Sequence, residues 1–211
     1  EVIVVVLTLQ SDQFFFRAKN KYNMSVVGIK NGTSGLFQRP IDYLELTQEI
    51  FSGYLLKQGG TFLGTTNKGN PFNLINKDGK KIDQSKVIIE GYRQLGLEGL
   101  IIIGGDGSMQ ILHDLAKKGG LNIVAIPKTI DNDVGATDAS IGFDTAVFVA
   151  TQALDNLHST AVSHSRSMIL EVMGRDAGHI ALSAGIAGGA DVVLIPEIKY
   201  SINGIIDKLN E

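Results

Sequence analysis

Short apolar segments rich in β-branched residues alternate along the chain with longer segments whose apolar residues recur at helical spacing. The apolar segments are continuous, which is typical of parallel strands that helices cover on both faces. They are Val2 to Leu7, Ser25 to Ile29, Gly99 to Ile103, Asn122 to Ile126, Ser167 to Val172 and Asp191 to Ile195. The helical segments are Ser85 to Leu95, Ser108 to Lys118, Phe143 to Leu157 and Ala177 to Ala187. This alternation predicts an α/β fold with a doubly wound, mostly parallel sheet and helices on both faces.

Glycines follow most of the predicted helices. Gly96, Gly119-Gly120 and Gly188-Gly189 are placed as C-terminal stops. The segment Leu9 to Tyr22 is different, because it lies where a doubly wound fold often has its first phosphate-binding turn and yet contains no glycine. Its phenylalanines and basic residues allow a helix with a basic face, but not a tight glycine cradle.

Composition and charge narrow the function further. The 211 residues are enough for one large α/β domain or two packed ones. No apolar run is long enough to cross a bilayer, so a membrane role is not expected. The absence of cysteine excludes thiol catalysis and thiolate metal sites and favours a reducing cytoplasm. A net charge of -3 provides no broad cationic field for nucleic acid, so any anion must be bound locally.

The turn Gly104-Gly105-Asp106-Gly107-Ser108 directly follows an apolar strand. Glycines let the backbone approach a phosphate, and amides at the start of the next helix point at the anion. The carboxylate suits Mg²⁺, which usually takes one or two carboxylates beside water and phosphate oxygens. The alternative is an ordinary turn in which Asp106 or Ser108 caps the helix.

A second polar motif, Pro127-Lys128-Thr129-Ile130-Asp131-Asn132-Asp133, follows the next strand. Ligands of open α/β sheets bind at this edge. In an extended segment Thr129, Asp131 and Asp133 would share one side, so a hydroxyl and two carboxylates would converge on a reacting hydroxyl group. Asp-Asn-Asp is also good turn chemistry, so a plain loop remains the alternative.

A third motif places arginines on both sides of the predicted strand Ser167 to Val172. Arg166 precedes this strand, and Met173-Gly174-Arg175 follows it. The planar guanidinium group binds phosphoryl oxygens bidentately and would stabilise charge that develops during phosphoryl transfer. The histidines have no spacing typical of zinc, so none is assigned a catalytic role.

In their order and spacing these motifs resemble 6-phosphofructokinases, and the resemblance extends from Ser25 to the end of the sequence. It implies transfer of the γ-phosphoryl group of ATP to the 1-hydroxyl of fructose 6-phosphate. Asp131 would be the base, Thr129 and Arg175 would stabilise the transferring group, and Asp106 would act through Mg²⁺.

The resemblance also implies the remaining contacts of the site. Arg166 would reach the sugar 6-phosphate from a neighbouring subunit, which implies a homo-oligomer, a dimer or a tetramer. Met173, Gly174 and Asp133 would contact the sugar phosphate. The family is cytoplasmic, glycolytic and often allosteric. These expectations assign residues 1–160 to a nucleotide-binding domain and residues 161–211 to the start of a sugar-phosphate domain that is incomplete in this chain.

Donor choice depends on Gly107 and Lys128. Family members that use pyrophosphate are similar at Lys128 but carry Asp in place of Gly107, where the side chain would fill the space of the nucleotide α-phosphate. Gly107 therefore favours ATP, with pyrophosphate as the alternative.

The chain departs from the family in two places. The first glycine-rich phosphate loop has no counterpart in Leu9 to Tyr22. Where the family often has Arg, this chain has Asn67, which leaves Lys68 as the nearest cation for the nucleotide. An NAD or lipid kinase that shares the Gly-Gly-Asp-Gly turn and a non-catalytic nucleotide-sensing subunit are therefore kept as further alternatives.

Overall fold

The computed structural model describes residues 2–6, 11–51, 60–66, 70–76 and 78–210. The chain forms two compact units, Glu1–Ile126 and Pro127–Glu211, and each is described by itself. The domain boundary expected at residue 160 stays a prediction. Among the described residues, no helix combines the length and the apolar character that crossing a membrane requires.

The first unit is built on a mostly parallel sheet. The strand β1 pairs in parallel with β2 and with β6, whereas β3 is antiparallel to β2. The strands lie in the order β3-β2-β1-β6-β7. Their bounds are β1 Val2–Val6, β2 Ser25–Ile29, β3 Tyr43–Glu45, β6 Gly99–Gly104 and β7 Ile123–Thr129. The four predicted strands before residue 130 are therefore confirmed to within three residues at each end.

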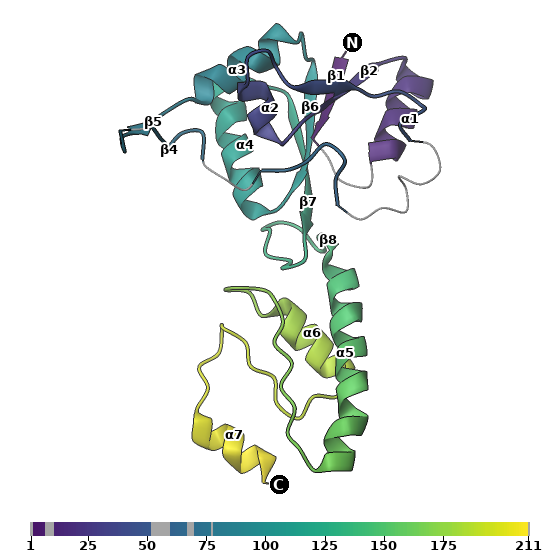
Figure 1. Cartoon of the computed structure of the whole chain (residues 1–211), viewed down its shortest axis with the longest axis vertical. Helices are drawn as coiled ribbons and strands as arrows, with labels where there is room; N and C mark the ends of the chain where they lie inside the picture. The colour runs from purple at the N-terminus through teal and green to yellow at the C-terminus, as the bar shows by residue number, and fades with distance from the viewer. Residues whose placement is uncertain (1, 7–10, 52–59, 67–69, 77, 211) are drawn as a thin grey trace. The chain divides into compact units, whose positions relative to one another are not determined.

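Helices cover both faces of this sheet (Figure 1). The helices are α1 Ser11–Tyr22, α2 Thr33–Phe37, α3 Ser85–Gln94 and α4 Asp106–Gly119, and a small hairpin joins β4 Leu74–Ile75 to β5 Lys81–Ile82. Along β2, Val27 and Ile29 belong to the core under α3 and α4, whereas Val26 belongs to the core under α1. This alternation is the two-residue period of a strand, and it makes the sheet doubly wound, as predicted.

Two glycines end helices as the sequence indicated. Gly120 is the C-terminal cap of α4 and has a left-handed φ of 61°. Gly96 lies just beyond α3 with φ 64°. Glycine adopts these angles without the steric cost that a Cβ atom imposes.

The segment after β1 forms the helix α1, and the structure shows no glycine turn in Ser11–Tyr22. Phe15 of this helix is buried and stacks on Phe51, with ring centroids 4.9 Å apart. The phenylalanine cluster therefore serves the hydrophobic core. Leu9 and Gln10 lie outside the described residues.

The second unit begins with the end of β7, where Lys128 and Thr129 pair in parallel with Ile141 and Gly142 of β8. It continues into helices α5 Phe143–His164, α6 His179–Ala187 and α7 Ile202–Leu209. Ala150 of α5 packs against Ile180 and Ala184 of α6 to form its small buried core.

The strands predicted over Ser167 to Val172 and Asp191 to Ile195 are wrong. Both segments lack strand structure, and within the described residues no neighbouring strand offers either of them a backbone ladder. Ile169 consequently has 93% of its surface exposed. The apolar pattern favoured strands here, but it does not reveal whether a partner strand exists.

Candidate active site

The glycine turn of the first unit joins β6 to α4. The helix begins at Asp106, two residues earlier than predicted, and the main-chain N–H groups of Ser108 and Met109 donate to the Gly105 carbonyl oxygen at 3.1 Å each. Asp106 is exposed in the first helical turn. The Asp106 side chain therefore lies at the start of the helix, where main-chain amides attract anions.

Two glycines of this turn differ in how much space surrounds them. A Cβ atom on Gly104 would lie 3.1 Å from the Cβ of Ser108, which is tighter than ordinary packing. A Cβ atom on Gly107 would meet no atom within 4 Å. The fold therefore does not require a glycine at position 107, and the space beside it is open.

The second motif forms a tight polar loop at the end of β7. The N–H of Asp131 donates to the Thr129 hydroxyl at 3.1 Å, which joins two of the predicted site residues. Lys128 is half-buried beside them on β7. The strand ends at Thr129, and Asn132 then adopts a left-handed φ of 53°.

The strand that would give the expected alternation ends at Thr129, so strand geometry does not place Asp131 on the same side as Thr129. Asp133 is exposed after the bend, so its place on the same side does not follow from strand geometry. Its contact with the sugar phosphate stays a prediction.

The carboxylate of Asp131 has an unusual environment. Its Oδ1 atom is buried, and no partner among the described residues donates a hydrogen bond to it. A buried polar atom without a partner costs free energy, of the order of 1–3 kcal/mol. Such an oxygen lacks a hydrogen-bond donor that a bound hydroxyl group would supply.

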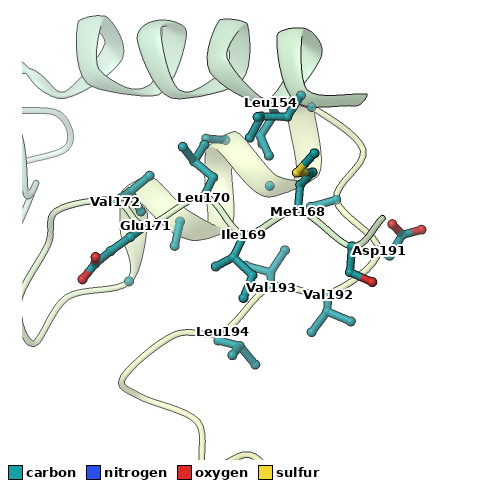
Figure 2. Close-up of a pocket in the computed structure, with 18 of the residues that line it drawn as sticks. Leu154, Met168, Ile169, Leu170, Glu171, Val172, Asp191, Val192, Val193 and Leu194 are labelled. Carbon is teal, nitrogen blue, oxygen red and sulfur yellow. The ribbon is translucent and has the colours of Figure 1, made fainter. Parts of the chain in front are cut away.

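A groove of about 760 Å³ in the second unit brings the residues of the third motif together. Arg166, Met173, Gly174 and Arg175 all line it. Figure 2 shows the residues around Ile169 and Val193 on neighbouring segments, below Leu154 of α5. The two segments that lack strand structure therefore form the walls of this groove.

The backbone at the end of the first wall is strained. Gly174 has φ 150°, and a Cβ atom there would collide with the Ala177 carbonyl oxygen, so the fold itself requires glycine. Arg175 has a left-handed φ of 53° and an exposed side chain. No hydrogen bond or ion pair with another described residue holds its guanidinium group, nor that of Arg166. Neither guanidinium group is neutralised within the described chain, so both arginines are free to bind an anion.

Glu197 fixes the other wall and was not singled out by the sequence. Its Oε1 atom accepts a hydrogen bond from the Gly178 N–H at 2.7 Å, at the start of α6. This hydrogen bond lowers the pKa of the Glu197 carboxyl below its usual value. No sequence pattern connects residues so far apart, so only the fold reveals the contact.

The other predicted contacts of the site are not seen among the described residues. Asn67 and Lys68 lie outside the described residues. No hydrogen bond or ion pair between described residues joins the Asp131 loop to Arg175. The glycine turn belongs to the first unit and the other two motifs to the second.

The described residues contain no group of three or more His, Cys, Asp or Glu side chains that would enclose a metal ion. Asp106 stands as a single exposed carboxylate beside the glycine turn. This donor set fits Mg²⁺, which retains water and binds substrate phosphates instead of requiring a protein cage.

A doubly wound sheet whose polar loops follow the carboxyl ends of its strands defines an α/β protein that binds ligands at that edge. The family model described as Phosphofructokinase matches residues 13–211, so the chain belongs to the phosphofructokinase family.

Individual curated proteins of the same family are similar to this chain. The chain is 59% identical over 190 residues to "ATP-dependent 6-phosphofructokinase 1" of Synechocystis sp., an alignment that covers 90% of this chain and 52% of that protein. It is 62% identical over 182 residues to the Nostoc sp. protein of the same name, covering 85% and 50%. The chain thus spans about half the length of the curated relatives it matches.

Among solved structures, the phosphofructokinase of Saccharomyces cerevisiae matches with a TM-score of 0.76 at 27% identity, covering 99% of this chain and 30% of that one. A pyrophosphate-dependent phosphofructokinase from Marinobacter aquaeolei matches with a TM-score of 0.73 at 21% identity, covering 99% and 56%. The second likeness supports the fold alone.

Proposed function

We propose that the polypeptide containing this chain is an ATP-dependent 6-phosphofructokinase, which transfers the γ-phosphoryl group of ATP to the 1-hydroxyl of fructose 6-phosphate. The observation that carries the proposal is the buried, unpaired Oδ1 atom of Asp131 at the carboxyl end of a strand. Membership of the phosphofructokinase family disfavours the NAD or lipid kinase alternative.

Asp131 acts as the general base. As the sugar O1 atom forms its bond to the γ-phosphorus, the bond from that phosphorus to the β,γ-bridging oxygen breaks and ADP leaves. The hydroxyl proton passes to the Asp131 carboxylate. Proton transfer to a positioned carboxylate contributes about 10²–10⁴-fold to the rate.

Thr129 and Arg175 act on the group in transfer. The Thr129 hydroxyl accepts from the Asp131 N–H, so its own proton remains free to donate to a phosphoryl oxygen. Arg175 has an unpaired guanidinium group that binds phosphoryl oxygens bidentately. Met173 and Gly174 line the sugar side, and Arg166 binds the 6-phosphate in a homo-oligomer with shared sites.

The donor is bound by Gly105, Asp106, Gly107 and Ser108, and Asn67 and Lys68 complete the proposed contacts. The open space beside Gly107 supports a nucleotide, because an α-phosphate needs room that an Asp side chain would fill. Mg²⁺ held by Asp106 and the phosphates would neutralise the negative charge on the donor. Lys128 is the feature shared with pyrophosphate users, so pyrophosphate is the second candidate donor.

The test is a coupled assay of the complete natural polypeptide with fructose 6-phosphate and either ATP or pyrophosphate. Asp131→Asn should lower kcat about 10²–10⁴-fold and leave KM nearly unchanged, because the base acts in the transition state. Asp155→Asn on the exposed surface of α5 is the matched control. An Asp131→Asn protein with full turnover would contradict the role of Asp131 as the base. A wild-type protein that binds nucleotide but is inactive with both donors would contradict the proposal and fit a nucleotide-sensing subunit.

A further inference from the structure

Ser140 lies immediately before β8 and is only 5% exposed. It is one of the two polar residues that are buried in the described part of the chain. No motif in the sequence pointed to it. Its hydrogen bonds reach back to the loop that carries Asp131.

The contacts of Ser140 bracket Asp131 on both sides. Its hydroxyl lies 2.8 Å from the Thr129 carbonyl oxygen and 3.1 Å from Oδ1 of Asn132, and its main-chain N–H donates to the same Oδ1 at 2.8 Å. The hydroxyl has one proton, and the shorter distance assigns it to the Thr129 carbonyl. The N–H of Ser140 then serves the Asn132 side chain.

These bonds matter because the Asp131 carboxylate has no hydrogen bond of its own in the described chain. A carboxylate that accepts no hydrogen bond is oriented only by its backbone and by packing. The backbone before Asp131 is held through the Thr129 carbonyl, and the backbone after it is held through Asn132. The Ser140 hydroxyl therefore fixes the flank before Asp131, and the Ser140 main-chain N–H fixes the flank after it.

The left-handed backbone of Asn132 adds to the requirement. Its φ of 53° turns the chain directly after Asp131, and this conformation is costly for a residue other than glycine. The hydrogen bond from the Ser140 N–H holds the Asn132 side chain in the arrangement that this turn produces.

We propose that Ser140 is a positioning residue for the catalytic base: through Thr129 and Asn132 it holds Asp131 where its unpaired oxygen receives the proton of the sugar hydroxyl. This inference rests on the proposed function of Asp131. It assigns Ser140 no contact with substrate.

A merely structural role would lower stability but would not depend on the Asp131 carboxylate. The distinguishing experiment is therefore a double-mutant cycle. Ser140→Ala and Asp131→Asn are made singly and together in the complete natural polypeptide, and kcat and KM for fructose 6-phosphate are measured well below each variant's unfolding temperature.

We expect Ser140→Ala to lower kcat about 10–100-fold, because misplacing a reacting group by about 1 Å costs up to about 10²-fold. KM should change little. In the Asp131→Asn background the same substitution should lower kcat no further, because no base remains to be positioned. Ser140→Thr keeps a hydroxyl and should restore most of kcat.

Two further variants serve as a control and as an independent test. Thr151→Val removes a hydroxyl that donates to the Val147 carbonyl at the same 2.8 Å, within α5, and should keep wild-type kcat. Asn132→Gly tolerates the left-handed φ and removes the acceptor of the Ser140 N–H. It tests the second flank independently, and it should also lower kcat even if Ser140→Ala fails to fold.

The outcomes separate the two proposals. An active wild-type protein in which Ser140→Ala keeps kcat, or lowers it equally in both backgrounds, overturns the positioning role and leaves the proposed function intact. A wild-type protein inactive with both donors overturns both.

Discussion

Two glycines of α4 illustrate how a residue's backbone separates a structural role from a functional one. Gly107 lies in the first turn of the helix with open space around its Cα, and Gly120 caps the last turn with φ 61° and equally open space. Only the second glycine is required by its backbone angle. Packing explains neither, so the proposed donor site is the explanation to be tested for the glycine at position 107.

Gly107→Ala should therefore stabilise the protein by about 0.5–1 kcal/mol, because glycine in a helix is unfavourable and no clash results. Gly107→Asp should keep the fold and raise KM for ATP about tenfold or more, because it places a negative charge beside the donor phosphates. Thermal unfolding and steady-state kinetics check both. Gly120→Ala is the control, which should destabilise the helix end without changing KM for ATP, and an unchanged KM in Gly107→Asp would remove the argument for the donor site.

Arg175 has a strained, left-handed backbone. Its side chain makes no hydrogen bond or ion pair with the described residues that would offset this strain. Replacing it by glycine removes a left-handed cost of about 1 kcal/mol and adds chain entropy to the unfolded state. We expect Arg175→Gly to unfold at the same temperature as wild type or higher, while kcat falls about 10²–10³-fold through loss of charge stabilisation.

Calorimetry and the coupled assay measure the two effects of Arg175→Gly separately. Asn23→Gly, at a left-handed φ of 51° just after α1, is the matched control and should keep kcat. A variant that loses stability and activity in proportion would show that the strain has no functional reason.

At the scale of elements, a charged pair ties the start of α3 to the end of α4. Lys118 donates to Asp83 and to the Ser85 hydroxyl, at 2.5 Å and 2.7 Å, and Asp83 also accepts from the Ser85 N–H at 2.9 Å. The hydrogen bond from Lys118 is the first reason that the Asp83 carboxyl has a pKa well below its usual value, followed by those from Ser85.

A lowered pKa in the folded state means that the stabilisation is present above the unfolded-state pKa of about 3.9 and is lost as the pH falls toward the folded-state pKa. Asp83→Asn should therefore lower the urea midpoint at pH 7 and flatten its decline below about pH 4. Both partners are partly exposed, so high salt should reduce the difference. Asp114→Asn, an exposed acid on α4, is the control, and equal acid sensitivity in wild type and Asp83→Asn would contradict the pair's role.

The elements also show what a sequence can predict. The strands β1, β2, β6 and β7 and the helices α3 to α6 were predicted because their apolar patterns extend over several residues. The short strands β3 and β8 were missed because two or three residues carry no pattern. Ser167 to Val172 has a strand's composition, and yet a strand needs a neighbour that no local pattern reveals.

The same limit applies to the site. Thr129 and Asp131 stand out because polar residues directly follow an apolar strand. Ser140 and Glu197 act through hydrogen bonds to residues distant in sequence. Their roles follow only from the folded chain, as does the open space beside Gly107.

At the scale of the whole molecule, the proposed function predicts a site that is shared between two copies of the polypeptide. Arg166 has an exposed side chain without a partner in the described chain, and a sugar phosphate bound by the neighbouring copy would supply the missing anion. In a symmetric dimer each copy would lend its Arg166 to the other's Asp131. Two proteins that are each inactive should then complement each other.

We expect Asp131→Asn and Arg166→Ala proteins to be nearly inactive alone and to recover about a quarter of wild-type kcat after unfolding and refolding as an equimolar mixture. Random pairing makes half of the dimers mixed, and one of the two sites in each mixed dimer combines an intact Asp131 with an intact Arg166. Mixing without refolding should recover less, because subunits must exchange. If the refolded mixture stays as inactive as its components while refolded wild type recovers, Arg166 serves the site of its own chain, and the shared-site arrangement is excluded.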